Sequence, residues 1–175
     1  RSGGGITISG GEPTMQLDFT LALLKKAKEE GLHTAVDTSG FVEAYKFKKL
    51  LPYLDLVLLD LKTMDAQKHK NLTGVSNQKT LKILKLLEEQ KQPYWIRQVI
   101  LPGMTDDLEE MQEFAEFLQQ QRYLEKIELL PYHELGKHKW KNLGLEYKLE
   151  AVEPPSAEKM AELNAVFENY KVNTA

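Results

Sequence analysis

The sequence contains no cysteine, so its 175 residues can form neither a disulfide nor a cysteine-ligated metal centre. No apolar run approaches the roughly 20 residues that a membrane-spanning helix needs. The net charge of -3 lacks the basic excess typical of a nucleic-acid-binding surface, and no basic, apolar secretion leader is visible. With 42% hydrophobic and 28% charged residues, the composition is that of an ordinary soluble globular protein. We therefore expect a cytoplasmic protein that binds neither nucleic acid nor membrane.

The sequence also lacks an initial methionine. The residues Arg1-Ser2-Gly3-Gly4-Gly5 run directly into an apolar segment. We expect that residues 1–175 form one domain and are a fragment of a longer protein.

Short apolar segments alternate with longer amphipathic ones along the whole chain. Strands are predicted at residues 6–8, 33–36, 56–59, 94–101 and 126–130. Helices are predicted at residues 15–30, 43–51, 77–91 and 107–121, and from a cap at Ser156 to about residue 170. This α/β alternation indicates parallel strands joined by right-handed crossovers, in either a doubly wound sheet or part of a (β/α) barrel.

Two local predictions follow from the same patterns. Residues 56–59 are apolar at every position, which predicts a strand buried on both faces. Thr105 or Asp106 is predicted to cap the helix at 107–121.

Polar residues follow each predicted strand, except in the fourth strand, which contains one. They are Gly10 to Pro13 after the first strand, Asp37 and Thr38 after the second, Asp60 and Lys62 after the third, Arg97 in the fourth, and Tyr132 and His133 after the fifth. The carboxyl ends of parallel strands share one rim, which is where such folds bind ligands. Carboxylates, a lysine and a histidine converging there suit a zwitterionic or cation-bearing ligand.

Each of these groups also has a purely structural interpretation. Gly10 to Pro13 can be a tight strand-to-helix turn, and Asp37 to Gly40 can be an Asx turn. His133 can be an ordinary loop histidine. Asp60 and Lys62 point the same way directly after an apolar strand, so they form either a structural ion pair or part of a site.

Four segments resemble one enzyme family. Ser9 to Pro13 resembles the GGE motif of radical S-adenosylmethionine enzymes. Leu59 to Lys62 resembles the D-L-K segment of the glycyl-radical-enzyme activases, and Ile96 to Gly103 resembles their strand that ends in P-G. The most specific segment, Lys126 to Trp140, is similar almost letter for letter to the activases of pyruvate formate-lyase. The motifs occur in the family's order and cover essentially the whole chain.

The resemblance implies a partial (β/α)6 barrel, here truncated at its amino terminus to about five parallel strands. In the family, an amino-terminal C-x-x-x-C-x-x-C loop holds a [4Fe–4S] cluster. An electron from the cluster, supplied by a flavodoxin-type donor, cleaves bound S-adenosylmethionine, and the resulting radical takes a hydrogen atom from a glycine of the partner enzyme. The partner implied here is pyruvate formate-lyase, and the setting is anaerobic metabolism.

The resemblance also implies roles for individual residues. The residues that match the S-adenosylmethionine-binding set are Gly10, Gly11, Glu12, Asp60, Lys62 and His133. The residues that match a monovalent-cation site beside the ligand carboxylate are Asp37, Thr38 and Asp60. The resemblance implies that Arg97 positions either the adenosyl group or the incoming glycine loop of the partner enzyme.

The missing cysteines limit what this chain can do alone, because no other residues replace three thiolate ligands. We expect the parent protein to be the enzyme, and the fragment to be inactive and to hold neither cofactor firmly. We also expect an uncovered sheet edge at residues 6–8 to favour an edge-strand dimer. Two other functions remain open from the residues: a barrel-type lyase that forms a Schiff base on Lys62, and a non-catalytic module that docks a partner.

Overall fold

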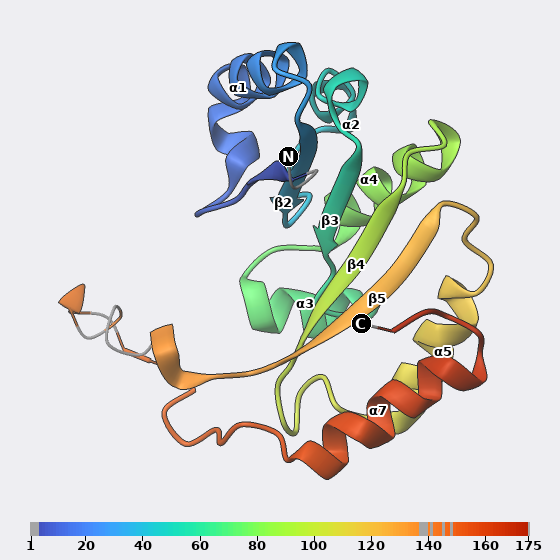
Figure 1. Cartoon of the computed structure of the whole chain (residues 1–175). Helices are drawn as coiled ribbons and strands as arrows, with labels where there is room; N and C mark the ends of the chain where they lie inside the picture. The colour runs from blue at the N-terminus through green and yellow to red at the C-terminus, as the bar shows by residue number, and fades with distance from the viewer. Residues whose placement is uncertain (1–3, 137–139, 141, 145, 148, 175) are drawn as a thin grey trace.

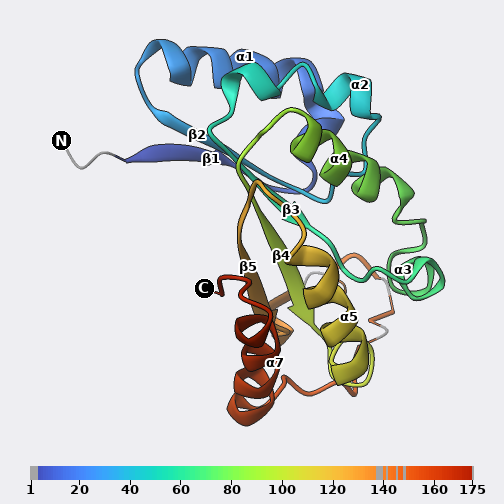
Figure 2. The same ribbon diagram turned by 90° about the vertical axis from the view of Figure 1, so that its right-hand side faces the viewer.

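Five parallel strands form one sheet in the part of the chain that the computed structural model describes, which is residues 4–136, 140, 142–144, 146–147 and 149–174. The strands are β1 (Gly5–Ile8), β2 (His33–Thr38), β3 (Leu56–Asp60), β4 (Tyr94–Ile100) and β5 (Leu124–Pro131). Their spatial order follows their sequence order, which Figure 1 shows for β2 to β5 and Figure 2 for β1 beside β2. Each crossover therefore moves one place along the sheet, which is the winding of a (β/α) barrel and not of a doubly wound sheet.

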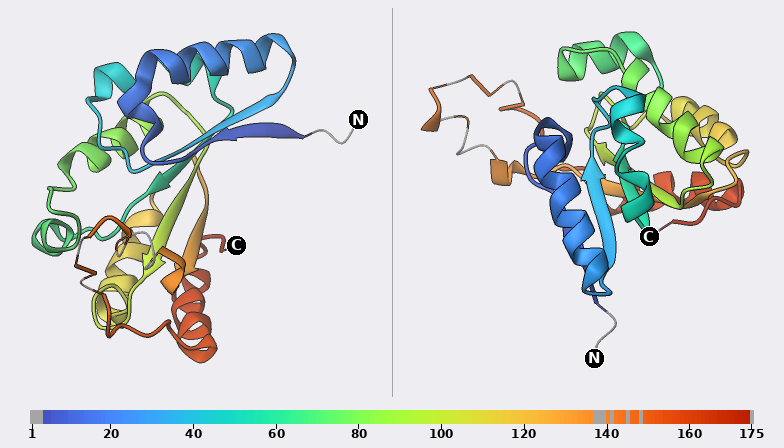
Figure 3. Two further views of the ribbon diagram at one scale, coloured as in Figure 1. Left: turned by 90° about the vertical axis from the view of Figure 1, so that its left-hand side faces the viewer. Right: turned by 90° about the horizontal axis from the view of Figure 1, so that it is seen from above.

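Helices gather on one side of this sheet and leave the other side open (Figures 2 and 3). The α-helices are α1 (Leu17–Glu29), α2 (Ala44–Phe47), α3 (Ala66–Thr73), α4 (Gln78–Glu89), α5 (Leu108–Leu118) and α7 (Ala157–Asn169). The short 3₁₀ turns are η1 (Pro13–Gln16), η2 (Leu51–Tyr53) and η3 (Glu134–Gly136). Strands β1 and β5 do not pair with each other, so the barrel is partial.

The two faces of the sheet differ in burial, and the difference repeats at every second residue. The covered face, which packs against the helices, carries fully buried side chains: Val36, Val57, Leu59, Ile96 and Ile127. The open face carries half-buried side chains, most of them charged: Asp37, Leu58, Asp60, Arg97 and Glu128. Because side chains alternate along a strand, parallel register brings each set together on its own face.

The prediction that residues 56–59 are buried on both faces was wrong. Strand β3 alternates, with Val57 and Leu59 buried and Leu56 and Leu58 only half-buried. The reason is the open side of the partial barrel, where no layer of helices covers the strand.

The turn after β2 packs closely against the covered face. Gly40 has φ +67, and a Cβ at this position would lie 2.9 Å from Leu59 Cδ1 and 3.3 Å from the backbone of Thr80 in α4. Only glycine combines this left-handed conformation with such a close approach. The turn thereby lets α4 place Ile83 and Leu87 against the sheet, where both are fully buried.

The predicted helices are present, with three differences. The helix predicted at residues 43–51 is only four residues long, Ala44–Phe47, and the 3₁₀ turn Leu51–Tyr53 follows it as a separate element. The helix at 107–121 begins at Leu108 and is capped by Asp107, whose carboxylate accepts a hydrogen bond from Glu110 N at 3.0 Å. Thr105 and Asp106, the predicted caps, instead bond within the preceding turn, where they accept from Leu101 N and Gly103 N. Helix α3 was not predicted, although Asp65 caps its start and Gly74 ends it in the left-handed conformation. The cap of α7 at Ser156 is confirmed.

Strand β1 forms one edge of the sheet and pairs only with β2. At the other edge, β5 gains an isolated parallel bridge between Ile127 and Thr174. Among the described residues, no helix has the length and apolar character to cross a membrane.

Candidate functional site at the open face

Glu12 joins the loop after β1 to the loop after β2. Its Oε1 accepts from Thr14 N (3.0 Å), Thr14 Oγ1 (2.7 Å) and Thr38 Oγ1 (2.7 Å). Its Oε2 accepts from Ser39 N (2.9 Å) and Ser39 Oγ (2.6 Å). Burial raises the pKa of Glu12, but the hydrogen bonds from Ser39, Thr38 and Thr14 outweigh burial and hold this pKa below its ordinary value. The carboxylate is thus committed to holding the two loops together.

The glycines before Glu12 leave the backbone of this loop accessible. Gly10 has φ +110, a conformation that other residues rarely adopt, and Gly11 is exposed. A Cβ at either position would meet no atom within 4 Å, so the space beside the loop is open. Glu12 therefore fixes a loop whose main chain faces free space.

A charged network crosses the open face from β1 to β5. Ser9 Oγ donates to Asp37 Oδ2 at 3.2 Å, and Arg97 Nη1 donates to the same oxygen at 2.7 Å. Arg97 Nε donates to Glu128 Oε2 at 2.8 Å. The side chains of Asp37, Arg97 and Glu128 are about three-quarters buried, so their ion pairs are screened less than surface pairs. Arg97 in β4 thereby connects β2 with β5 across β3.

Asp60 and Lys62 lie at the end of β3, beside this network. Lys62 Nζ is 2.6 Å from Asp60 Oδ2, and Gln98 Nε2 donates to the backbone oxygen of Lys62 at 3.1 Å. Asp60 Oδ1 is buried and has no hydrogen-bond partner within the described chain. A buried carboxylate oxygen without a donor is costly, so this atom marks a position where a donor or cation would be stabilised.

The ion-paired side chains around Asp37 and Asp60 sum to a negative value. Three carboxylates (Asp37, Asp60 and Glu128) stand against two cations (Lys62 and Arg97), while Lys126 on the same face lies over the Trp95 ring. One further positive group would balance them, and the unpartnered oxygen of Asp60 is where it would be received.

The remaining predicted residues lie elsewhere on the rim. The hydroxyl of Thr38 donates to Glu12 and accepts from Gly40 N, on the covered side of β2, away from Asp37 and Asp60 on the open face. His133 is exposed after the end of β5, and no hydrogen bond or ion pair to it occurs within the described residues. The structure therefore brings Asp37, Asp60 and Lys62 to one face, while His133 lies beyond the end of β5 without a hydrogen bond to them among the described residues.

Sequence reasoning missed two members of the network, Ser9 and Glu128. Glu128 was placed in a predicted strand and in the Lys126 to Trp140 segment, but it was given no role of its own. Its place directly beside Arg97 in the parallel register of β4 and β5 is the signal that marks it.

An apolar pocket of about 260 Å³ adjoins Lys62 beyond the strand ends. Leu101, Trp140 and Tyr147 are among the residues that line it. The hydroxyl of Tyr147 lies 2.5 Å from that of Tyr132, and burial together with this hydrogen bond raises the pKa of Tyr132 to about 12. The Tyr132 hydroxyl thus stays protonated at neutral pH, and its hydrogen bond joins Tyr147 to the residue that follows β5.

The sequence matches the family described as the radical SAM superfamily over residues 1–118. The chain is 47% identical over 171 residues to the pyruvate formate-lyase 1-activating enzyme of Escherichia coli strain K12, covering 97% of this chain and 70% of that protein. The chain belongs to the radical SAM superfamily, among its pyruvate formate-lyase-activating enzymes. The corresponding enzyme of Staphylococcus epidermidis is 48% identical over 167 residues, which are 92% of this chain and 66% of that protein.

A solved structure agrees with this membership. A domain of the pyruvate-formate lyase-activating enzyme from Bacteroides vulgatus superposes with a TM-score of 0.82 at 29% identity, covering 98% of each chain. The partial parallel barrel of the radical SAM superfamily is therefore the fold of this chain, as the motifs had predicted.

The superfamily implies two groups, S-adenosylmethionine and an iron–sulfur cluster, and the open face suits only the first. Asp60 Oδ1, which has no partner among the described residues, can accept from an ammonium group, and Lys62 beside it can donate to a carboxylate, so together they suit the two ends of an amino acid. Iron–sulfur clusters are held by thiolates, and this sequence has no cysteine. The described residues also contain no group of three His, Asp or Glu side chains that would hold a metal ion.

Proposed function

We propose that these residues are the major part of a glycyl-radical-enzyme activase that acts on pyruvate formate-lyase. In this proposal a [4Fe–4S] cluster, held by cysteines outside residues 1–175, supplies the electron for reductive cleavage of S-adenosylmethionine and so for hydrogen abstraction from a glycine of the partner. The observation that carries the proposal is the unpartnered Asp60 Oδ1 on a charged face of a chain that is 47% identical to such an activase.

Asp60 and Lys62 bind the methionine end of the ligand in this proposal. Asp60 Oδ1 accepts from the ligand ammonium, while Oδ2 holds Lys62 Nζ in position to donate to the ligand carboxylate. Gly10 and Gly11 offer backbone oxygens to the same ammonium, since the space beside them is open. Glu12 acts indirectly, because its hydrogen bonds position that loop.

The charged network supports the rest of the pocket. Arg97 positions the adenosyl group or the incoming glycine loop, and its two carboxylate partners fix its orientation. Asp37 and Asp60 supply hard oxygen ligands for a monovalent cation, whereas the hydroxyl of Thr38, the third residue of the family pattern, is bonded to Glu12 on the covered side. His133 completes the pocket from the end of β5.

Residues 1–175 form a single domain in this proposal, and a solved domain of the same extent supports that boundary. Alone, the chain is inactive and holds neither cofactor firmly. The open edge of β1 then offers its backbone groups to a second copy, which would form an edge-strand dimer. The parent enzyme receives its electron from a flavodoxin-type donor in the cytoplasm.

Reconstitution tests the proposed activity. The native gene product, with any residues that precede Arg1, is loaded with iron and sulfide, reduced, and supplied with S-adenosylmethionine and pyruvate formate-lyase. We expect 5′-deoxyadenosine and a glycyl radical signal in electron paramagnetic resonance, with neither product from residues 1–175 alone. A native gene without a cysteine triad, or a loaded protein that yields no 5′-deoxyadenosine, contradicts the proposal. Borohydride trapping of a carbonyl compound on Lys62 would favour a Schiff-base lyase instead.

A further inference from the structure

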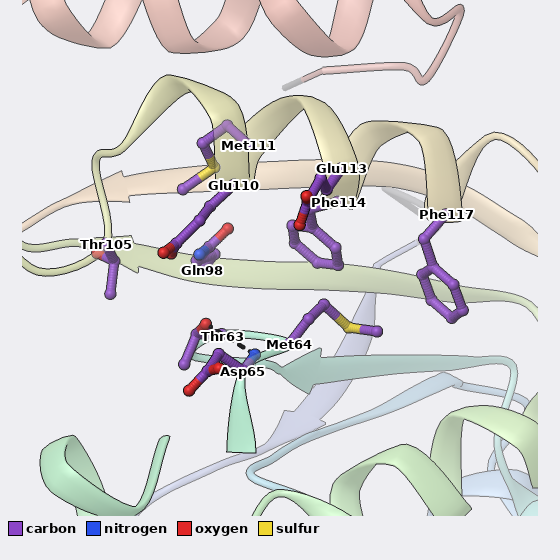
Figure 4. A pocket seen from close by; sticks show the side chains of 10 residues that line it. All are labelled: Thr63, Met64, Asp65, Gln98, Thr105, Glu110, Met111, Glu113, Phe114 and Phe117. Atoms are coloured by element: carbon purple, nitrogen blue, oxygen red, sulfur yellow. Dashed lines mark hydrogen bonds between the residues drawn. The ribbon is translucent and has the colours of Figure 1, made fainter. Parts of the chain in front are cut away.

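A second pocket lies on the covered side of the sheet, opposite the charged network. It has a volume of about 300 Å³ and lies between β4, the loop after β3 and helix α5 (Figure 4). The proposed activity uses none of its side chains. We call it the α5 pocket, and it is defined by Thr63, Met64, Gln98, Glu110, Phe114 and Phe117.

Gln98 gives the α5 pocket a buried hydrogen-bond acceptor without a donor. Its side chain is only 2% exposed, and its Nε2 donates to the backbone oxygen of Lys62 at 3.1 Å. Its Oε1 has no partner among the described residues. A flipped amide would place Oε1 against the Lys62 carbonyl, where two acceptors repel, so this orientation is fixed. The acceptor lies among the pocket residues, between the loop after β3 and α5 (Figure 4).

The α5 pocket has a polar end and an apolar end, as Figure 4 shows. Gln98, Thr105 and Glu110 lie at the polar end, while Phe114 and Phe117 extend toward the other. Phe114 is 4% exposed, so the apolar wall is largely shielded from water. A ligand that matches this arrangement has a donor group at one end and a short apolar stem at the other.

Acidic side chains around the α5 pocket favour a positively charged hydrogen-bond donor over a neutral one. Asp65, Glu110 and Glu113 line the pocket, and one cation, Lys68, pairs with Glu110. Three carboxylates against one lysine leave a local charge of -2. Phe114 and Phe117 offer no ligand to a metal ion, so an organic cation with an apolar stem matches the lining better.

We propose that the α5 pocket binds a primary alkylammonium ion. Its ammonium group donates to Gln98 Oε1 and is attracted by the carboxylates at the polar end, and its stem packs along Met64, Phe114 and Phe117. A pocket of about 300 Å³ has room for a stem of several carbons. Both a free alkylamine and the side chain of a lysine present this chemistry.

Titration of the 175-residue chain with n-pentylammonium chloride tests the proposal. The nuclear magnetic resonance signals of the Met64 and Met111 methyl groups, which belong to residues that line the α5 pocket, should shift until the pocket is saturated. The neutral isostere n-pentanol should bind about tenfold more weakly, because it lacks the charge. A parallel titration with N-acetyl-lysine methylamide distinguishes the two sources: binding equal to that of n-pentylammonium indicates a lysine side chain, and weaker binding indicates a free amine.

A pair of charge reversals on α5 provides the matched control. Glu113 lines the pocket and Glu116 does not, and both are exposed on the same helix. Glu113→Lys should weaken n-pentylammonium binding about tenfold, whereas Glu116→Lys should change it less than about twofold. Gln98→Met, which removes the acceptor at similar volume, should also weaken binding about tenfold.

The proposal is overturned if the methionine resonances show no saturable shift, or if n-pentanol binds as tightly as the ammonium ion. Equal effects of Glu113→Lys and Glu116→Lys would overturn it as well. These readouts do not depend on any activity of the open face, so the two proposals fail or succeed separately.

Discussion

The two faces of the same sheet are built from alternating residues of the same strands, yet they have opposite characters. In β3, Leu59 is fully buried against helices, and its neighbour Asp60 carries an unpartnered oxygen on the open face. In β4, Ile96 belongs to the core, and the next residue, Arg97, joins two carboxylates. Residues that stabilise the fold thus alternate with residues proposed to bind the ligand. Substitutions at adjacent positions of one strand should therefore affect stability and ligand binding separately.

The largest expected effect is on the covered face. Leu59→Ala removes a fully buried side chain and should lower the free energy of unfolding by about 2–5 kcal/mol. Leu58→Ala is the matched control on the open face, where the side chain is half-buried, and should cost less than about 1.5 kcal/mol. Urea denaturation of both variants measures the contrast. Equal losses would show that the open face is packed as tightly as the covered one.

The next largest effect concerns the charged network. Arg97→Met leaves Asp37 and Glu128 without their cation and should lower the free energy of unfolding by about 2 kcal/mol, because the pairs are only partly exposed. Arg122→Met, at an exposed position outside the network, should change it by less than about 0.5 kcal/mol. The loss for Arg97→Met should shrink in 1 M salt, as screening predicts. A loss for Arg122→Met as large as that for Arg97→Met would contradict the structural role of the network.

A smaller effect is expected from Glu12, with a defined pH dependence. Because its pKa is lower in the folded chain, the carboxylate contributes stability that is present above the ordinary value of 4.5 and is lost as pH falls through the lowered pKa. Glu12→Gln should therefore be less stable than the unchanged chain by about 1 kcal/mol at pH 7, and this difference should diminish below pH 4.5. Thermal unfolding across this pH range measures it. A difference that stays constant with pH would contradict the role of the charged form.

The fold was largely predictable from the sequence, because each strand is a short apolar run and most helices have strong apolar periodicity. The one-sided burial of β3 was not predictable, because four consecutive apolar residues give no alternation that would identify the open side. Helix α3 has only eight residues and one buried side chain, His69, so its periodic signal is weak. At α5, three adjacent residues are good caps, and only the backbone decides that Asp107 is the one used.

The site was predictable in part for similar reasons. Strand-end positions identified Asp37, Asp60, Lys62 and Arg97, because parallel strands end at one rim. Grouping Asp37 with Thr38 by strand end overlooked that adjacent residues of a strand point to opposite faces, which turns the Thr38 hydroxyl to the covered side. Glu128 could be recognised only from the register between β4 and β5, which places it beside Arg97. Gln98 could be recognised only from its hydrogen bond to the backbone oxygen of Lys62.

The affinity for S-adenosylmethionine of the iron- and sulfide-loaded native gene product, with and without Asp60→Asn, tests the central claim most directly. The asparagine removes the negative charge and the pairing with Lys62, while the exposed Asp18→Asn serves as control. The account predicts binding weakened about tenfold or more by Asp60→Asn, with an unchanged affinity in Asp18→Asn. An affinity unaffected by Asp60→Asn would contradict the placement of the ligand ammonium at this carboxylate.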